Sequence, residues 1–111
     1  MRFLMLVLAD PEADTSEEPV LTIGEWSAET TEAGVNVDGD RLQPPERAKT
    51  VRRRGGKVVV TDGPFAETRE VIAGFDILEC RDMDHAIEVA TRHPMATHGT
   101  LELRALWPLD L

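Results

Sequence analysis

The feature that most constrains the fold is the apolar run at residues 3–9, near the start of the 111-residue chain. Every residue in it is apolar, and Asp10 and Pro11 follow directly. A run of this length, ended by turn residues, is typical of a β-strand covered on both faces. The chain must therefore place apolar partners on two sides of one strand.

Composition agrees with one globular domain over residues 1–111, with 41% apolar and 30% charged residues. The net charge of −9 at pH 7 argues against nucleic acid and membrane surfaces as partners, because phosphates and anionic lipids repel an acidic chain. The lone cysteine, Cys80, fits a reducing compartment. Residues 3–9 are short for a secretory signal, and no other stretch is long enough to span a bilayer. We expect a complete cytoplasmic chain.

Two amphipathic helices are expected. Thr22 and Glu25 have the spacing of a capping box, which predicts a helix over residues 23–33 that ends at Gly34. A second helix can be capped by Asp82 and ended by Pro94. Its apolar residues recur at helical spacing: Met83, Ala86, Ile87 and Ala90. Because Ile87 lies at the centre of this stripe, we expect it to be buried.

Several segments have strand character. Arg54-Gly55-Gly56 separates two runs rich in β-branched residues, 49–53 and 57–61, and this pattern predicts a hairpin. Gly74 suits a bulge or a close backbone approach within a strand. The other expected strands cover residues 35–37, 71–80 and 100–105.

We interpret the order as β-α-β-β-β-α-β, an α+β chain in the ferredoxin-like arrangement with both helices on one face of an antiparallel sheet. Residues 3–8 and 58–60 offer apolar side chains to both faces of that sheet. The face without helices would then be exposed, and the same face of a second copy is the economical cover. The sequence therefore predicts a homodimer.

Residues 60–70 read Val-Thr-Asp-Gly-Pro-Phe-Ala-Glu-Thr-Arg-Glu. This string resembles the motif of the DGPF-motif, YCII-related family, with Arg69 in place of the usual lysine. The resemblance covers nearly the whole chain, including residues 38–45, Gly74-Phe75, His93-Pro94 and 99–104. It implies a dimeric α/β barrel built from two ferredoxin-like chains.

The resemblance leaves three functions open. YCII proteins proper resemble small isomerase- or lyase-like proteins with a His–Asp pair in a cleft between sheet and helices. Their histidine lies on the first helix, whereas this chain has no histidine before His85, so that pair has no matching position. Other family members occur beside or fused to extracytoplasmic-function sigma factors, which implies a non-catalytic ligand-binding or regulatory dimer. A purely structural dimer is the third alternative.

Asp62 and His93 are the candidate acid–base residues. Asp62 follows a strand at a Gly-Pro corner, where a carboxylate can take a proton or bind a cation. The alternative is an Asx-type turn in which its side chain binds backbone amides. His93 extends the apolar face of the second helix and can act as an acid or base. The alternative is a helix-terminal residue whose positive form is stabilised by the helix dipole.

A small-molecule ligand of unknown identity is expected near the motif. Phe65 either packs in the core or contacts that ligand, and the other candidate ligand-binding residues are Gln43, Gly63, Pro64 and Arg104. Neither paired cysteines nor a His-x-x-x-His spacing indicates a metal, and no glycine-rich phosphate motif indicates a nucleotide, so we expect no metal and no cofactor. Residues 10–32 are acidic and residues 41–57 are largely basic. The two segments are either solvated or meet across a dimer.

Overall fold

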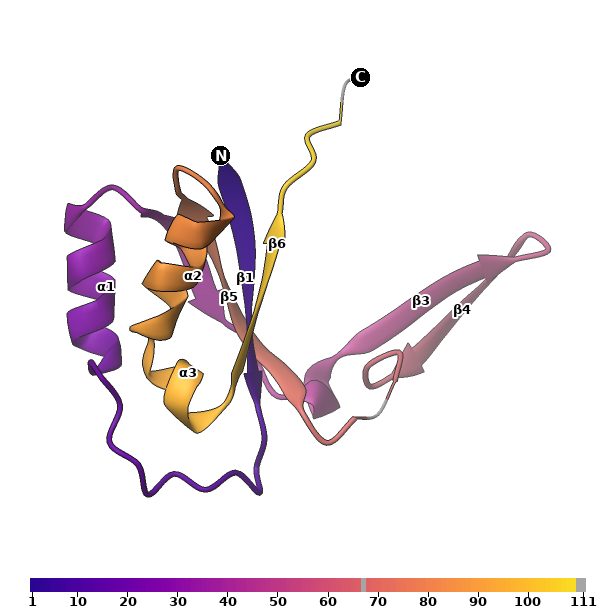
Figure 1. Ribbon diagram of the computed structural model, residues 1–111. Coiled ribbons are helices and arrows are strands. Elements are labelled where there is room, and N and C mark those ends of the chain that lie inside the picture. The colour runs from indigo at the N-terminus through magenta and orange to yellow at the C-terminus, as the bar shows by residue number, and fades with distance from the viewer. Residues whose placement is uncertain (67, 110–111) are drawn as a thin grey trace.

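The computed structural model describes residues 1–66 and 68–109 (Figure 1). The elements run in the order β1 (Arg2–Ala9), α1 (Ile23–Glu32), β2 (Asn36–Arg41), the 3-10 helix η1 (Pro45–Arg47), β3 (Lys49–Arg54), β4 (Lys57–Asp62), β5 (Val71–Glu79), α2 (Met83–Thr91), α3 (Pro94–His98) and β6 (Thr100–Ala105).

Four strands form an antiparallel sheet in the order β2-β5-β1-β6. β1 is central because it pairs with β5 on one side and with β6 on the other. Each helical connection joins two strands that are separated by a third, so the sheet contains the two split βαβ units of the ferredoxin-like arrangement. The expected α+β class and this arrangement are confirmed.

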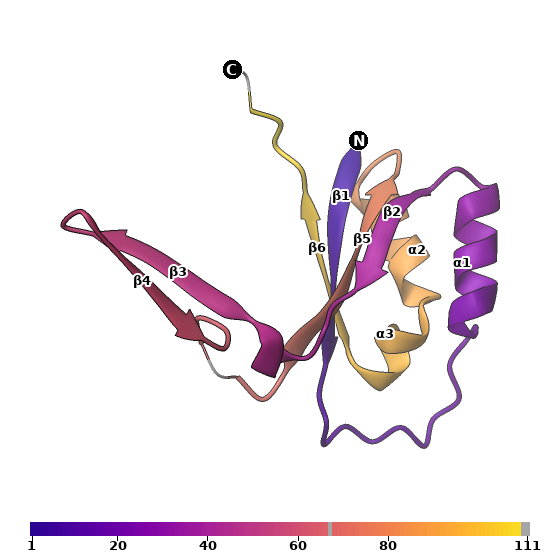
Figure 2. The ribbon, with the colours of Figure 1, turned by 180° about the vertical axis from the view of Figure 1, so that it is seen from behind.

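The helices lie on one face of the sheet in both ribbon views (Figures 1 and 2). Alternation along β1 explains this, because Phe3 and Met5 are fully buried beneath the helices while Leu4 and Leu6 point to the other face. The buried apolar cluster contains Phe3, Met5, Trp26, Val35, Leu78, Cys80, Ala86 and Ala90. We call the side without helices the open face; its central residues are Leu4, Leu6, Leu8, Phe75 and Ile77.

The hairpin is confirmed, but its place in the sheet is not as expected. β3 and β4 pair only with each other and project from the body on the side away from the helices (Figures 1 and 2). Gly55 and Gly56 close the turn with φ values of 56° and 76°, as the Gly-Gly signal requires. Val58 and Val60 are therefore more than half exposed. We call residues 49–62 the arm.

The arm also changes the order of the strands. Four strands, β2 to β5, lie between α1 and α2, where the order β-α-β-β-β-α-β has three. The expected segments 35–37, 49–53, 57–61 and 71–80 each correspond to one of these four strands. Pro44 has φ −56° and ψ 154°, and Pro45 begins the 3-10 turn η1. Proline fits there because the first residue of a helix needs no amide donor.

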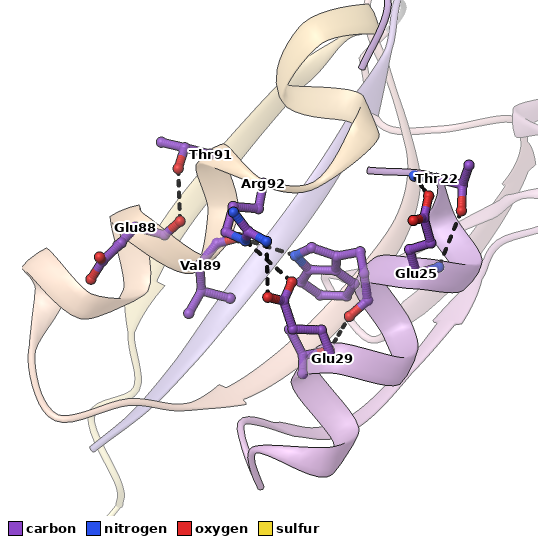
Figure 3. Close-up of polar contacts among 9 residues, drawn as sticks. Thr22, Glu25, Glu29, Glu88, Val89, Thr91 and Arg92 are labelled. Carbon is purple, nitrogen blue, oxygen red and sulfur yellow. Dashed lines mark hydrogen bonds and ion pairs between the residues drawn. The ribbon is translucent and has the colours of Figure 1, made fainter. Parts of the chain in front are cut away.

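The capping box at the start of α1 is confirmed. The Thr22 hydroxyl accepts from the Glu25 amide at 3.1 Å, and the Glu25 carboxylate accepts from the Thr22 amide at 3.0 Å (Figure 3). These reciprocal bonds satisfy two amides that have no partner within the helix. Gly34 follows the helix with a φ of 70°, the left-handed conformation that glycine adopts after a helix end.

The expected burial of Ile87 is wrong. Ala86 and Ala90 are buried in α2, but Ile87 is 48% exposed and Met83 is 38% exposed. The two alanines allow α2 to lie close to the body, and the partly buried Val89 packs beside them. The buried stripe therefore runs along Ala86, Val89 and Ala90 rather than through Ile87.

Pro94 does follow the end of α2, but it also begins α3, so His98 is helical rather than in a loop. Contacts between the Trp26 turn of α1 and the end of α2 hold these helices together. The Trp26 indole Nε1 donates to the Val89 carbonyl at 3.0 Å. The Arg92 guanidinium donates to both carboxylate oxygens of Glu29, at 2.9 and 3.2 Å (Figure 3).

Across residues 1–66 and 68–109, no helix has the length and apolar character that crossing a bilayer requires.

Candidate functional site

A cavity of about 540 Å³ lies on the helix side of the sheet, between β2, β5, α1 and the start of α3. Its walls are mostly apolar, and its lining includes two side chains that can carry a proton, Asp76 and His93. The remaining lining residues are Val7, Ile23, Trp26, Ser27, Asn36, Gly39, Asp40, Arg41, Ala73, Gly74, Phe75, Pro94 and Met95. A small molecule in an apolar cavity with a few polar groups is oriented by those groups.

Two glycines at this cavity lie where neighbouring atoms approach the backbone too closely for a side chain. Gly39 on β2 pairs with Asp76 on β5, and a Cβ at position 39 would overlap the Asp76 carboxylate and lie 2.7 Å from the Phe75 carbonyl oxygen. Gly74 is similarly restricted, because its Cβ would lie 2.9 Å from the Asp40 carbonyl oxygen. The expected close backbone approach at Gly74 is therefore confirmed.

Asp76 is the acidic group of the cavity. It pairs with the fully buried Met5 on β1, so its side chain points toward the helices. Burial raises the pKa of the Asp76 carboxyl to about 6, although a hydrogen bond from Asn36 Nδ2 at 3.3 Å opposes this shift. A carboxyl with this pKa exchanges its proton readily near neutral pH.

His93 is held in one orientation. It caps the N-terminus of α3, where its Nδ1 accepts from the Met95 amide at 2.9 Å. Its ring meets the Trp26 indole edge-to-face, with ring centroids 4.7 Å apart. His93 is only 4% exposed, and burial lowers the pKa of its imidazole to about 4. The expected role as a positively charged helix-terminal residue is therefore wrong.

A neutral His93 presents a hydrogen-bond donor. Because Nδ1 accepts from Met95, the single ring proton lies on Nε2. Among the described residues no buried side-chain nitrogen or oxygen is left without a hydrogen-bond partner, and none of them bonds to Nε2. His93 is a lining residue of the cavity. Its Nε2–H can donate to a ligand oxygen.

Asp62 lies elsewhere. It ends β4 at the base of the arm, its side chain is 81% exposed, and it forms an ion pair with Lys49 on β3. The corner after it is made by Gly63, whose φ is 90° and whose amide donates to the Ala48 carbonyl at 2.7 Å. Within one chain, the structure does not place Asp62 beside His93 in the cavity described above.

The other expected ligand residues also lie outside this cavity. Pro64 and Gln43 are exposed in loops, and Arg104 pairs with Leu4 on the open face. Phe65 is 76% exposed, so the alternative of a core position for it is wrong. Its ring lies 4.9 Å beneath the guanidinium carbon of Arg52 on the arm, a cation–π contact.

Asp76, Asn36 and Trp26 were not identified as site residues from the sequence. Asp76 did carry a signal, since it is the acidic residue within the apolar stretch Val71–Leu78. A carboxylate in a covered strand must be hydrogen-bonded or protonated, and such positions gather at functional sites. Asn36 and Trp26 carried no comparable signal, because their role depends on how β2 and α1 are placed.

A second hollow, of about 590 Å³, lies along the outer side of α1. Its charged lining residues Glu25, Glu29, Glu32 and Arg92 are exposed, so they lack the burial that gives Asp76 and His93 unusual proton affinities. Within residues 1–66 and 68–109, no three His, Cys, Asp or Glu side chains are grouped as a metal site would need. The cavity with Asp76 and His93 is the candidate site.

The fold agrees with the comparison to known families. The model of the YCII-related domain matches residues 1–110, and the chain belongs to this family. It is also similar to an uncharacterised protein of Rhizobium meliloti (strain 1021), with 39% identity over 77 residues. That match covers 68% of this chain and 62% of the relative, so the chain spans less than two thirds of that protein's length.

Proposed function

We propose that the cavity binds a small carbonyl compound and catalyses proton transfer at the carbon beside the carbonyl, the step shared by many isomerases and lyases. The observation that carries this proposal is that Asp76 and His93, from two separate parts of the chain, line one cavity. One is a carboxyl group and the other a neutral imidazole whose Nδ1 is already occupied by the Met95 amide. These are the base and the hydrogen-bond donor that enolisation needs.

The steps follow from the two groups. The Asp76 carboxylate removes a proton from the carbon next to the carbonyl. The C–H electron pair becomes the double bond of an enolate, and the negative charge moves to the carbonyl oxygen. His93 Nε2–H donates a hydrogen bond to that oxygen. Return of the proton to a different carbon completes an isomerisation, whereas loss of a leaving group completes an elimination.

The neutral state of His93 suits its role as the hydrogen-bond donor to the carbonyl oxygen. A neutral imidazole polarises a carbonyl without lowering the proton affinity of a nearby carboxylate, as a fixed positive charge would. Asp76 then keeps a pKa of about 6, close enough to neutrality for both protonation states to be populated. The mostly apolar walls strengthen the hydrogen bond to the developing charge, because an apolar surrounding screens charge less than water does.

The test uses levulinate, a small keto acid, in deuterium oxide. Proton NMR should show loss of the signals beside the ketone at a rate above that of buffer alone. Asp76→Asn keeps the shape but cannot take the proton, so exchange should fall by at least about a hundredfold. Asp62→Asn is the matched control on the arm, and we expect it to leave exchange unchanged.

Each outcome separates the alternatives. Exchange that depends on Asp62 and not on Asp76 would overturn the assignment and restore the base expected from the motif. Binding of levulinate at cavity residues without Asp76-dependent exchange would favour a non-catalytic ligand-binding module. Association with a sigma factor stays a prediction of the family resemblance, and capture with a purified sigma factor would test it.

We also propose that two copies of the chain pair through their open faces. Leu4, Leu6 and Leu8 of β1 lie beside Phe75 and Ile77 of β5, and none of the five is fully buried in one chain. Polar residues of the edge strands flank this apolar stripe. An apolar centre within a polar rim is the pattern of an association surface.

The arm supports a second copy as the occupant. A two-stranded hairpin is marginally stable by itself, yet the arm carries Val51, Val58 and Val60 on one face of its ladder, each more than half exposed. The charged residues of the arm are mainly basic. Asp38 and Asp40, in contrast, lie on the open-face side of β2. A partner's open face would cover the valines and place acidic groups near the basic ones.

Light scattering tests this assembly. The parent chain should have twice the 12.3 kDa mass of one chain at micromolar concentration. Leu6→Glu, at the centre of the open face, should give a folded monomer, whereas Ile87→Glu on the helix side should leave the dimer intact. A monomeric parent, or a dimer that survives Leu6→Glu, would contradict pairing through this face.

A further inference from the structure

Arg41 is a cation of the same cavity for which the proposed proton transfer has no role. It is the last residue of β2 and lines the cavity. Positions 39 and 41 face the same side of the strand, and position 39 faces the Asp76 carboxylate. Arg41 pairs with Gly74, two residues from Asp76 on β5, and such diagonal neighbours lie about 7–8 Å apart. Its side chain therefore leaves the sheet on the same face as Asp76.

The guanidinium of Arg41 is uncommitted within the described part of the chain. Arg2, Arg69 and Arg92 each pair with carboxylates, but no ion pair joins Arg41 to a described carboxylate. Asp40, next to it, alternates to the open face. Gly74 lies opposite Arg41 and has no side chain to fill the space beside it. A planar donor fork is thus available at the β2 end of the cavity.

We propose that the ligand carries a carboxylate group, bound by Arg41, at the end of the molecule away from its reacting carbonyl. This inference rests on the proposed proton transfer at the same site, since it names the class of substrate. A guanidinium matches a carboxylate with two parallel hydrogen bonds. A phosphate is disfavoured, because its second negative charge would find no second cation among the cavity's lining residues.

A carboxylate there would also orient the ligand. Arg41 ends β2, which contacts α1, whereas His93 precedes α3, which contacts β1 and β6. A molecule that contacts both residues therefore spans the cavity. The carbon between its two oxygen-bearing groups then lies over Asp76, on the floor of the cavity. A ligand with a keto group and a carboxylate separated by a short apolar chain fits this arrangement.

The test compares levulinate with its uncharged methyl ester, which keeps the ketone. For the parent chain, we expect the exchange rate at low substrate concentration to be at least about tenfold higher for levulinate than for the ester. A factor of about ten is what one charge-assisted hydrogen-bonded pair contributes to binding. Arg41→Gln should remove this preference by slowing exchange of levulinate alone. Arg81→Gln is the matched control, because it removes one positive charge from an exposed loop outside this cavity.

The failures of the two proposals differ. Exchange that needs Asp76 but proceeds equally with acid and ester, or a preference that survives Arg41→Gln, would overturn the carboxylate and leave the proton transfer standing. Absence of Asp76-dependent exchange from both substrates would overturn the proton transfer itself, and with it this inference. Loss of folding in Arg41→Gln is checked by circular dichroism, and Arg41→Lys, which keeps the charge but not the fork, should retain part of the preference.

Discussion

Gly39 and Asp76 face each other across β2 and β5, and the missing side chain of the first makes room for the carboxylate of the second. The two residues are far apart in sequence, so their fit is a product of the fold. It also means that the acidic group of the cavity is positioned by the backbone of a neighbouring strand. A change at Gly39 therefore reaches the candidate site without altering any ionisable group.

Gly39→Ala should disturb both stability and activity. Its Cβ would overlap the Asp76 carboxylate and lie 2.7 Å from the Phe75 carbonyl oxygen, so β2 and β5 must move apart. We expect a loss of about 1–3 kcal/mol in the free energy of unfolding, measured by urea denaturation, together with loss of deuterium exchange. Gly24→Ala is the control, because only the Thr22 hydroxyl lies near its Cβ, at 3.9 Å. It should be neutral or stabilising, by up to about 1 kcal/mol.

Asp76→Asn should stabilise the protein at neutral pH. The native carboxyl has a pKa of about 6 and the reference value is 3.8, so between these pH values the native state binds more protons than the unfolded state. The free energy of unfolding therefore falls as pH rises through this window, and the penalty persists above it. Denaturation near pH 7 should show the variant to be more stable, and near pH 4 the difference should disappear. Glu88→Gln, an exposed carboxylate in α2, should show no such pH-dependent difference.

His93 should stay neutral well into the acidic range. Burial lowers its pKa to about 4, and the Met95 amide fixes the proton on Nε2. Heteronuclear NMR of the imidazole nitrogens reports both the protonation state and the tautomer. A ring that becomes protonated near its reference pKa of 6.5, or one that carries its proton on Nδ1, would contradict the donor role.

Ile87→Ala should cost little. Its side chain is 48% exposed, whereas Leu78 is fully buried. We expect a loss below about 1 kcal/mol for Ile87→Ala, against about 2–5 kcal/mol for Leu78→Ala. Chemical denaturation of the two variants measures the contrast directly, and equal losses would mean that α2 is turned differently on the sheet.

Much of the fold could be predicted because its signals are local. The capping box at Thr22, the turn at Gly55-Gly56 and the alternation of residues 100–105 each act over a few neighbouring residues. The rotation of α2 could not be predicted in this way, because Ala86 and Ala90 became the buried residues only through contact with α1 and the sheet. The arm was placed in the main sheet for a related reason: local pairing shows that two strands form a hairpin but not which surface they join.

The candidate site was harder to predict than the fold. His93 was found from its chemistry, yet its neutral state depends on burial beside Trp26, 67 positions earlier in the numbering. Asp76 could not be identified in this way, because its role depends on Gly39 of β2, which lies beside it only in the folded sheet. A turn motif can be recognised from a few consecutive residues, whereas a cavity is formed by elements that come together only after folding.

The position of β2 and β6 at the two edges of the sheet has a consequence for how this chain avoids fibrous aggregation. Edge strands expose backbone groups that can add another strand. If the β2 edges of two molecules met in antiparallel register, Asp38 and Asp40 would lie close to their own copies, and like charges placed across a ladder repel. β6 carries the charged residues Glu102 and Arg104 on its open-face side, and charged side chains on an edge strand disfavour the addition of another strand. Stacking of strands into a continuous ribbon is thereby disfavoured at both ends of the sheet, even in concentrated solution.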